Sequence, residues 1–126
     1  MKTALHALPA LLVLTACVAT SAPRPTEGPV SLGQTAYVGG PRVRPESVVE
    51  DSRCPANARC VWAGRAIVRV AVVTGSGMRR MDLTLGQPVR VADGTLTLVS
   101  VTPDRVAGAK PRPKAYRFAF AFAGGI

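Results

Sequence analysis

Residues 115–123 read Ala-Tyr-Arg-Phe-Ala-Phe-Ala-Phe-Ala and carry the clearest structural signal in the chain. Aromatic residues alternate with alanine and arginine, which is the two-residue period of a β-strand. All three phenylalanines of the chain lie in this row, and burying each contributes roughly 2–3 kcal/mol before entropy is counted. We therefore expect a strand that turns its aromatic face to the core and sits centrally in its sheet. Stacking of nucleic acid bases is the alternative use of such a row, and an export signal at the N-terminus argues against it.

The rest of the chain shows short strands separated by glycine, proline and aspartate, without a helical period of useful length. The longest is Arg65–Thr74, in which alternate residues from Ala66 to Val72 are apolar and share one face. Pro45 predicts an edge or a bulge, and Asp93-Gly94 predicts a hairpin turn. Further strands are expected at residues 30–38, 42–50, 78–85, 89–91 and 95–102.

Six to eight short antiparallel strands within residues 29–126 predict an all-β fold. We expect a small antiparallel β-sandwich with an immunoglobulin-like topology rather than a meander, or a partly open barrel. The length suits one domain with a modest core.

Two cysteines, Cys54 and Cys60, lie in the stretch Asp-Ser-Arg-Cys-Pro-Ala-Asn-Ala-Arg-Cys-Val-Trp-Ala-Gly at residues 51–64. In an exported protein this pair is expected to form a disulfide, because the compartment is oxidising. The ring is small, so the chain-entropy stabilisation is only about 2–2.5 kcal/mol. A redox pair would more typically have the spacing C-x-x-C, and a structural zinc site needs four ligands, so these alternatives are weaker.

The same stretch holds the only tryptophan, Trp62. We expect its ring to cover the disulfide or to cap the core. Asp51 and Ser52 are suited to start a turn by accepting backbone N–H groups, and Gly64 permits a close approach of the backbone as the next strand begins. The loop is then either a structural brace or a recognition loop, for which the candidate binding residues are Asn57, Arg59 and Trp62.

The pattern Asp-Ser-Arg-Cys-Pro followed by Cys-x-Trp-x-Gly resembles a group of small, largely uncharacterised bacterial exported proteins and lipoproteins. The similarity extends to Leu32-Gly33-Gln34 and to Tyr116-Arg117-Phe118. The resemblance implies a shared architecture and no particular chemistry.

Residues 1–16 have the pattern of a secretory signal peptide, with a basic start and an apolar run too short to span a bilayer stably. The tetrad Leu14-Thr15-Ala16-Cys17 resembles the lipobox of bacterial lipoproteins. The resemblance implies that Cys17 becomes the lipidated first residue, with enough acyl chains to hold the protein firmly on a membrane. A plain signal peptide with a chance cysteine is the alternative. Val18 stands where an aspartate would signal retention at the inner membrane, which favours the outer membrane facing the periplasm.

Three segments follow from this pattern: a signal peptide at 1–16, a lipidated cysteine with a flexible tether at 17–28, and a single β domain at 29–126. The tether is rich in proline and small residues and poor in apolar bulk. Its eleven residues after Cys17 reach at most about 35–40 Å when stretched.

Little in the chain suggests catalysis. The only histidine, His6, is lost with the signal peptide, which removes the residue most used for proton transfer and as a metal ligand. Glu50 and Asp51 are adjacent and should point to opposite faces of an extended chain, as should Met78 and Met81. We therefore expect no enzymatic activity, no cofactor and no metal site.

Basic residues gather in the segment between Arg105 and Arg117, which contains no acidic residue. Its candidate binding residues are Lys110, Arg112 and Lys114, set among two prolines. A cationic surface that only reflects composition and solubility is one interpretation, and an anionic partner is the other.

These patterns together predict a non-enzymatic, lipid-anchored β-sandwich of the cell envelope, with a binding or structural role towards anionic envelope components or an envelope protein. Export argues against nucleic acid as the partner. The alternative is a protease-inhibitor-like or chaperone-like module that presents the Cys54 to Cys60 loop to a protein.

Overall fold

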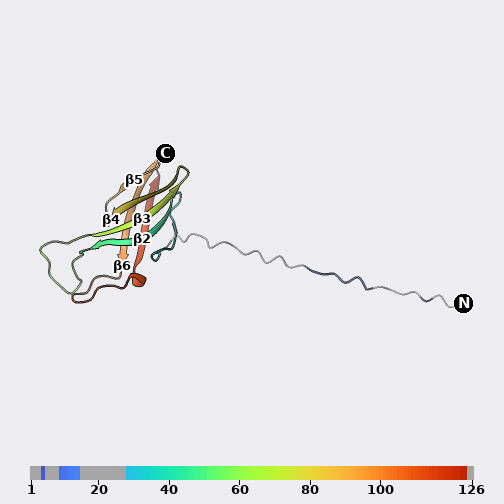
Figure 1. Ribbon diagram of the computed structural model, residues 1–126, viewed down its shortest axis with the longest axis horizontal. Coiled ribbons are helices and arrows are strands. Elements are labelled where there is room, and N and C mark those ends of the chain that lie inside the picture. The colour runs from blue at the N-terminus through green and yellow to red at the C-terminus, as the bar shows by residue number, and fades with distance from the viewer. Residues whose placement is uncertain (1–3, 5–8, 15–27, 125–126) are drawn as a thin grey trace.

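The structure is a computed structural model that describes residue 4, residues 9–14 and residues 28–124. The expected lipidation site at Cys17 and nearly all of the expected tether lie outside the described residues. Residues 28–124 form two antiparallel sheets that do not close into a barrel (Figure 1). The expected all-β fold and the small β-sandwich are confirmed.

The first sheet has the strand order β1-β2-β3-β4 and the second has the order β5-β6-β7. A short 3₁₀ helix, η1 (Pro113–Ala115), precedes the last strand. The strands are β1 (Ala36–Tyr37), β2 (Arg42–Asp51), β3 (Ala66–Thr74), β4 (Gly77–Thr84), β5 (Val89–Val91), β6 (Gly94–Thr102) and β7 (Arg117–Gly124).

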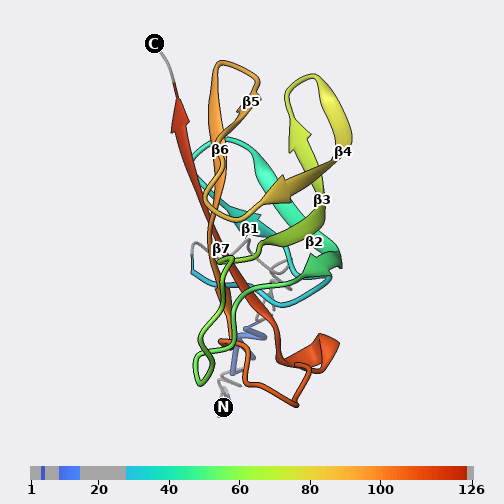
Figure 2. The same cartoon turned by 90° about the vertical axis from the view of Figure 1, so that its left-hand side faces the viewer.

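The core lies between the inner faces of the two sheets, whose strands cross one another (Figure 2). As the alternation in β3 predicts, alternate residues from Ala66 to Val72 are at most 1% exposed. They pack with Leu96 and Leu98 of β6 and with Phe118 of β7. The apolar faces of β3, β6 and β7 are therefore buried between the two sheets.

The connectivity differs from the expected immunoglobulin-like topology. Within each sheet every strand pairs with its neighbour in the sequence, so each sheet is a meander. The strand with the aromatic row, β7, also lies at the edge of its sheet rather than at the centre. On its outer side, within residues 28–124, β7 pairs only with Val30, whose backbone exchanges two hydrogen bonds with Phe118, at 2.9 and 2.8 Å. Burial against the facing sheet protects the aromatic rings, so β7 needs no strand on both sides, and Phe122 near its end is only partly buried.

Two other sequence expectations change at turns. The expected strand at residues 30–38 is reduced to β1, because a turn at Ser31–Gln34 interrupts it; there the amide of Gln34 donates to the carbonyl of Ser31. The hairpin predicted at Asp93-Gly94 turns one residue earlier, since Val91 pairs with Gly94 across Ala92-Asp93. Pro45 is fully buried, and the pairing of β2 with β3 shifts directly after it, which confirms the predicted bulge.

Candidate functional site

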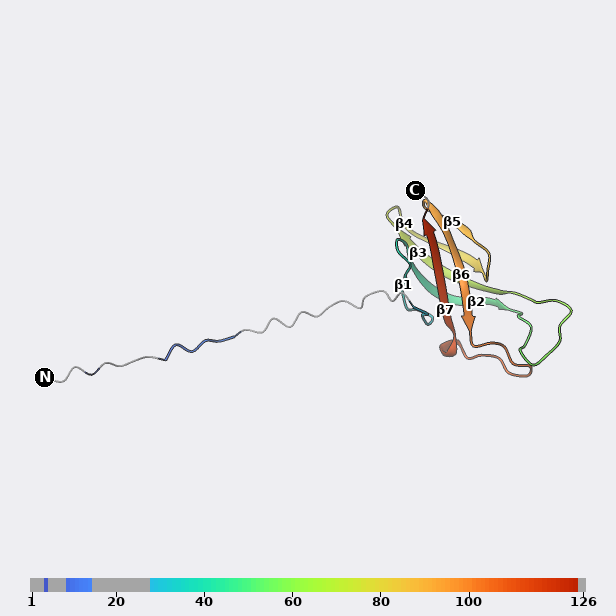
Figure 3. The same ribbon diagram turned by 180° about the vertical axis from the view of Figure 1, so that it is seen from behind.

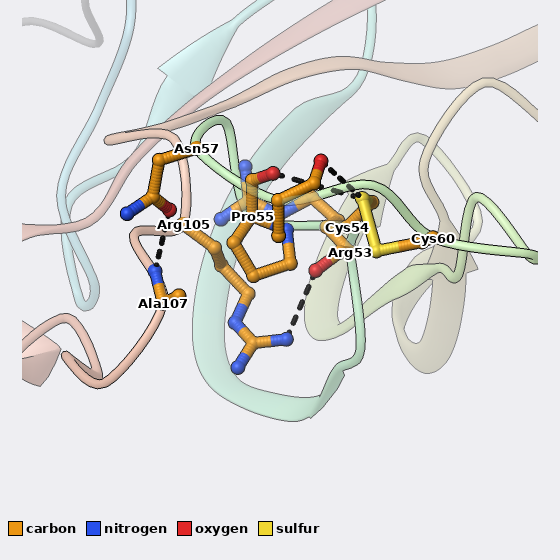
Figure 4. Close-up of a disulfide and its surroundings, with 8 residues drawn as sticks. Arg53, Cys54, Pro55, Asn57, Cys60, Arg105 and Ala107 are labelled. Atoms are coloured by element: carbon orange, nitrogen blue, oxygen red, sulfur yellow. Dashed lines mark hydrogen bonds between the residues drawn. A yellow bond between two sulfur atoms is a disulfide. The ribbon is translucent and has the colours of Figure 1, made fainter.

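Two long loops lie side by side at one end of the domain (Figures 1 and 3). The stapled loop, residues 52–65, connects β2 to β3, and the basic loop, residues 103–116, connects β6 to β7. The amide of Ala56 donates to the carbonyl of Arg105 at 2.7 Å. The amide of Ala107 donates to Oδ1 of Asn57 at 2.8 Å (Figure 4). Segments about 50 residues apart in the sequence therefore form one platform.

The disulfide Cys54–Cys60 is present, with 5.9 Å between the two Cα atoms, as the cysteine count predicts. Below the ring the loop is closed by backbone pairing. The amide of Cys54 donates to the carbonyl of Ala63 at 3.0 Å, and the amide of Ser52 donates to the carbonyl of Arg65 at 2.8 Å. Ser52 Oγ also accepts a hydrogen bond from the amide of Arg65, so Ser52 closes the neck of the loop against the opposite segment rather than starting a local turn.

A partly buried polar network joins the base of the stapled loop to the rest of the domain. Asp51 and Arg53 form a two-pronged ion pair with distances of 2.8 and 2.9 Å, and their side chains are 3% and 13% exposed. Arg53 also donates to the carbonyls of Val101 and Pro103. The hydroxyl of Tyr116 donates to Oδ2 of Asp51 at 2.8 Å. This Asp51–Arg53–Tyr116 network ties the stapled loop to both ends of the basic loop.

The network shifts the pKa values of its members. Burial alone would raise the pKa of Asp51, but hydrogen bonds from Arg53 and Tyr116 and the charge of Arg53 more than offset this, so the pKa lies below its ordinary value. Burial, together with the hydrogen bond to Asp51, raises the pKa of Tyr116 to about 12. Asp51 is thus held as a carboxylate and Tyr116 as a neutral phenol, which makes both poor catalysts of proton transfer near neutral pH.

The raised pKa of Tyr116 predicts a loss of stability in alkali. The folded state favours the neutral phenol, so this contribution is complete below the ordinary pKa of 10.0 and disappears as the pH rises through about 12. The loss amounts to roughly 2–3 kcal/mol, at 1.36 kcal/mol for each pKa unit. Urea unfolding of the wild type and of Tyr116→Phe between these pH values measures it. The Phe variant should show a flatter decline, while Tyr37→Phe, at an exposed tyrosine, should decline as the wild type does. Equal slopes in all three proteins would contradict the prediction.

The tip of the stapled loop departs from expectation. Trp62 is 82% exposed and Val61 is 92% exposed, so the expectation that Trp62 covers the disulfide or caps the core is wrong. Arg53 and Tyr116 already fill that end of the domain, and the pairing of Cys54 with Ala63 leaves residues 61 and 62 beyond the closed part of the loop.

The other candidate residues are divided between the two loops. Asn57 is on the surface, but its carbonyl oxygen is used to hold the basic loop. Arg59 is exposed and, within residues 28–124, has no ion-pair partner. The residues of the basic loop, Lys110, Arg112 and Lys114, are also exposed.

A groove of about 760 Å³ runs between the basic loop and β2. One wall is the segment of β2 from Glu46 to Asp51, which β1 does not cover because β1 pairs only with Arg42 and Val43. The other wall holds Lys110, two prolines and Tyr116. Lys110 thus stands at the edge of a cleft, and part of the basic loop forms one wall of that cleft.

Sequence reasoning missed the Asp51–Arg53–Tyr116 network and the bond from Arg105 to the carbonyl of Arg53, at 2.9 Å. One signal was available. Residues two apart on an extended chain lie on the same side, so Asp51 and Arg53 could have been paired from the sequence. The contribution of Tyr116, 65 residues away, could not.

Among the described residues, no three histidine, cysteine or acidic side chains come together as a metal site would require. Nor does that part of the chain contain a helix with the length and apolar character needed to span a bilayer. Comparison with protein family models, with curated proteins and with solved structures finds no match.

Proposed function

We propose that this protein is a non-enzymatic, lipid-anchored module of the bacterial envelope whose basic loop binds an anionic envelope component. The resemblance of residues 14–17 to a lipobox supports the anchor. The apolar residues Leu11 to Leu14 support a leader that is separate from the domain, since each is at least 74% exposed and none packs on the core.

The observation that carries the binding role is the state of Lys110, Arg112 and Lys114. All three are exposed, and none takes part in an ion pair within residues 28–124. Some arginines on the sheet surface are paired, such as Arg69 with Asp82 at 3.0 Å. Others, such as Arg42 and Arg79, also have no ion-pair partner within residues 28–124, but they are spread over different strands, whereas the three cations of the basic loop lie within five consecutive residues. Pro111 and Pro113 restrict the backbone between the three cations, so little conformational entropy is lost when they bind.

The partner class follows from this charge. Unpaired cations on a stiff loop attract phosphate or carboxylate groups, and each lysine or arginine near an anionic lipid surface contributes about 1 kcal/mol. Such binding weakens as salt rises, because the Debye length falls from about 10 Å at 0.1 M to about 3 Å at 1 M.

The test is the replacement of Lys110, Arg112 and Lys114 by alanine in the full chain, purified in a neutral detergent. The wild type should bind isolated cell-wall fragments or mixed micelles of phosphatidylglycerol at low salt and release them at about 1 M salt. The triple variant should bind about 100-fold more weakly at low salt. The charge-matched control replaces Arg42, Arg79 and Arg90, which are exposed and lie away from the basic loop, and it should bind as the wild type does. Unchanged binding of the triple variant to both materials would disprove the proposal.

A second candidate function is the presentation of the Cys54 to Cys60 loop to a protein partner. It is favoured by the exposure of Val61 and Trp62 beside the disulfide. A protein partner would bury Trp62 without any dependence on lipid composition, which distinguishes the two functions.

A further inference from the structure

The most exposed large apolar side chains of residues 28–124 are neighbours in the sequence. Val61 is 92% exposed and Trp62 is 82% exposed, and together they form what we name the apolar tip. Another apolar residue, Val106 on the adjoining basic loop, is 49% exposed. Tryptophan is usually largely buried, so an exposed tryptophan beside an exposed valine indicates a surface that contacts a partner.

The apolar tip stands on a braced support. The disulfide closes the loop on one side, the pairing of Cys54 with Ala63 closes its base, and Asn57 and Arg105 fasten it to the basic loop (Figure 4). A side chain presented by such a support loses little backbone freedom when it binds. The conformation that exposes Trp62 is therefore held in place by the contacts of the loop.

The surroundings of the apolar tip are cationic. Residues 52–81 and residues 105–124 contain no aspartate or glutamate. Exposed cations stand on both loops: Arg59 lies two residues before Val61, and the basic loop adds Lys110, Arg112 and Lys114. Tryptophan beside lysine and arginine is the composition found at the headgroup level of membranes, where an amphipathic ring lies among phosphates. The charge of this end of the domain complements an anionic bilayer surface.

We propose that the apolar tip docks on the anionic membrane to which the protein is anchored, with Trp62 and Val61 at headgroup level and the cations of both loops on the lipid phosphates. This inference rests on the proposed function and names its partner as a lipid surface. The residues between Cys17 and Pro29 reach at most about 40 Å, so the anchor keeps the domain within reach of the bilayer. Docking would then give the domain a fixed orientation on the membrane surface.

Trp62 is itself the probe, because it is the only tryptophan of the chain. The lipidated full chain is reconstituted into vesicles of phosphatidylcholine alone or with phosphatidylglycerol added, so that the acyl chains hold the domain at either surface. We expect the emission of Trp62 to move to shorter wavelength, and to be quenched by brominated lipids, only with the anionic lipid and only at low salt. Alanine at Lys110, Arg112 and Lys114 should lower the docking constant about 100-fold, as the loss of three surface cations implies.

Matched variants separate the contribution of the apolar tip to docking from the contribution of the cations. Val61→Ser retains the probe and should weaken the quenching, whereas Val99→Ser, which changes a valine 53% exposed on β6, should leave it unchanged. Emission that is the same with both lipids, equal quenching in Val61→Ser and Val99→Ser, or burial of Trp62 by an envelope protein in the absence of lipid would each overturn the inference. If the protein is recovered with membranes and still binds anionic material through the basic loop, these results leave the proposed function intact. Absence from the membrane fraction would instead refute the anchor and, with it, both proposals.

Discussion

Replacing Gly64 by alanine is expected to destabilise the domain strongly. Gly64 has a φ of +69°, and an added Cβ would lie 1.7 Å from the carbonyl oxygen of Ser52. The left-handed conformation alone costs an alanine about 1–2 kcal/mol. The clash is with backbone, so it can be relieved only by separating Ser52 from Arg65 and losing hydrogen bonds worth about 1 kcal/mol each. We expect a total of at least about 3 kcal/mol.

Urea unfolding with the disulfide intact measures this loss, which should lower the midpoint by about 1 M or more. Gly75→Ala is the control, because Gly75 lies in the turn between β3 and β4 with nothing within 4 Å of an added Cβ. It should change the stability by no more than about 0.5 kcal/mol. Equal midpoints for the two variants would show that the base of the loop is not closely packed.

Replacing Arg53 by methionine is expected to cost about 3–5 kcal/mol, because it leaves the carboxylate of Asp51 buried without its charge partner. Methionine keeps an apolar stem of similar reach but none of the donors that bind Asp51, Val101 and Pro103. Thermal or urea unfolding at neutral pH measures the loss. The exposed pair of Arg69 with Asp82 supplies the control, since Arg69→Met should cost at most about 1 kcal/mol.

Two further results would identify the buried ion pair as the cause. Because the folded protein lowers the pKa of Asp51, this contribution is present above its ordinary value of 3.8 and is lost as the pH falls through the lower folded value. The deficit of Arg53→Met should therefore shrink in acid. The double variant Asp51→Asn/Arg53→Met should be more stable than Arg53→Met alone, because the asparagine leaves no buried charge and still accepts from Tyr116. A double variant less stable than the single one would refute this account.

Much of the fold was predictable from local patterns. The two-residue periods of β3 and β7 and the glycine turn at Gly75 correctly placed strands and buried faces. The disulfide followed from the cysteine count. The errors concern features that depend on which strands pair, such as the edge position of β7 and the meander order within each sheet.

The candidate site was predicted less well than the fold. Trp62 was expected to be buried because large aromatic side chains usually are, but that end of the core is closed by Arg53 and Tyr116. Asn57 was a candidate binding residue if the stapled loop serves recognition rather than bracing, and its carbonyl oxygen accepts a hydrogen bond from the amide of Ala107. Both outcomes depend on the basic loop, whose position beside the stapled loop is not a property of either segment alone.

Strand formation, the alternation of faces, the disulfide and the lack of acidic residues between Arg105 and Arg117 are short-range properties of this chain, because each is set by residues within one segment. The exposure of the apolar tip, the burial of Asp51 with Arg53 and the union of two loops into one cationic platform are long-range properties. They depend on the pairing of β6 with β7 and of β2 with β3, which brings both loops to one end of the domain. No local sequence pattern encodes the contact between the two loops, so it is decided only by the folded structure.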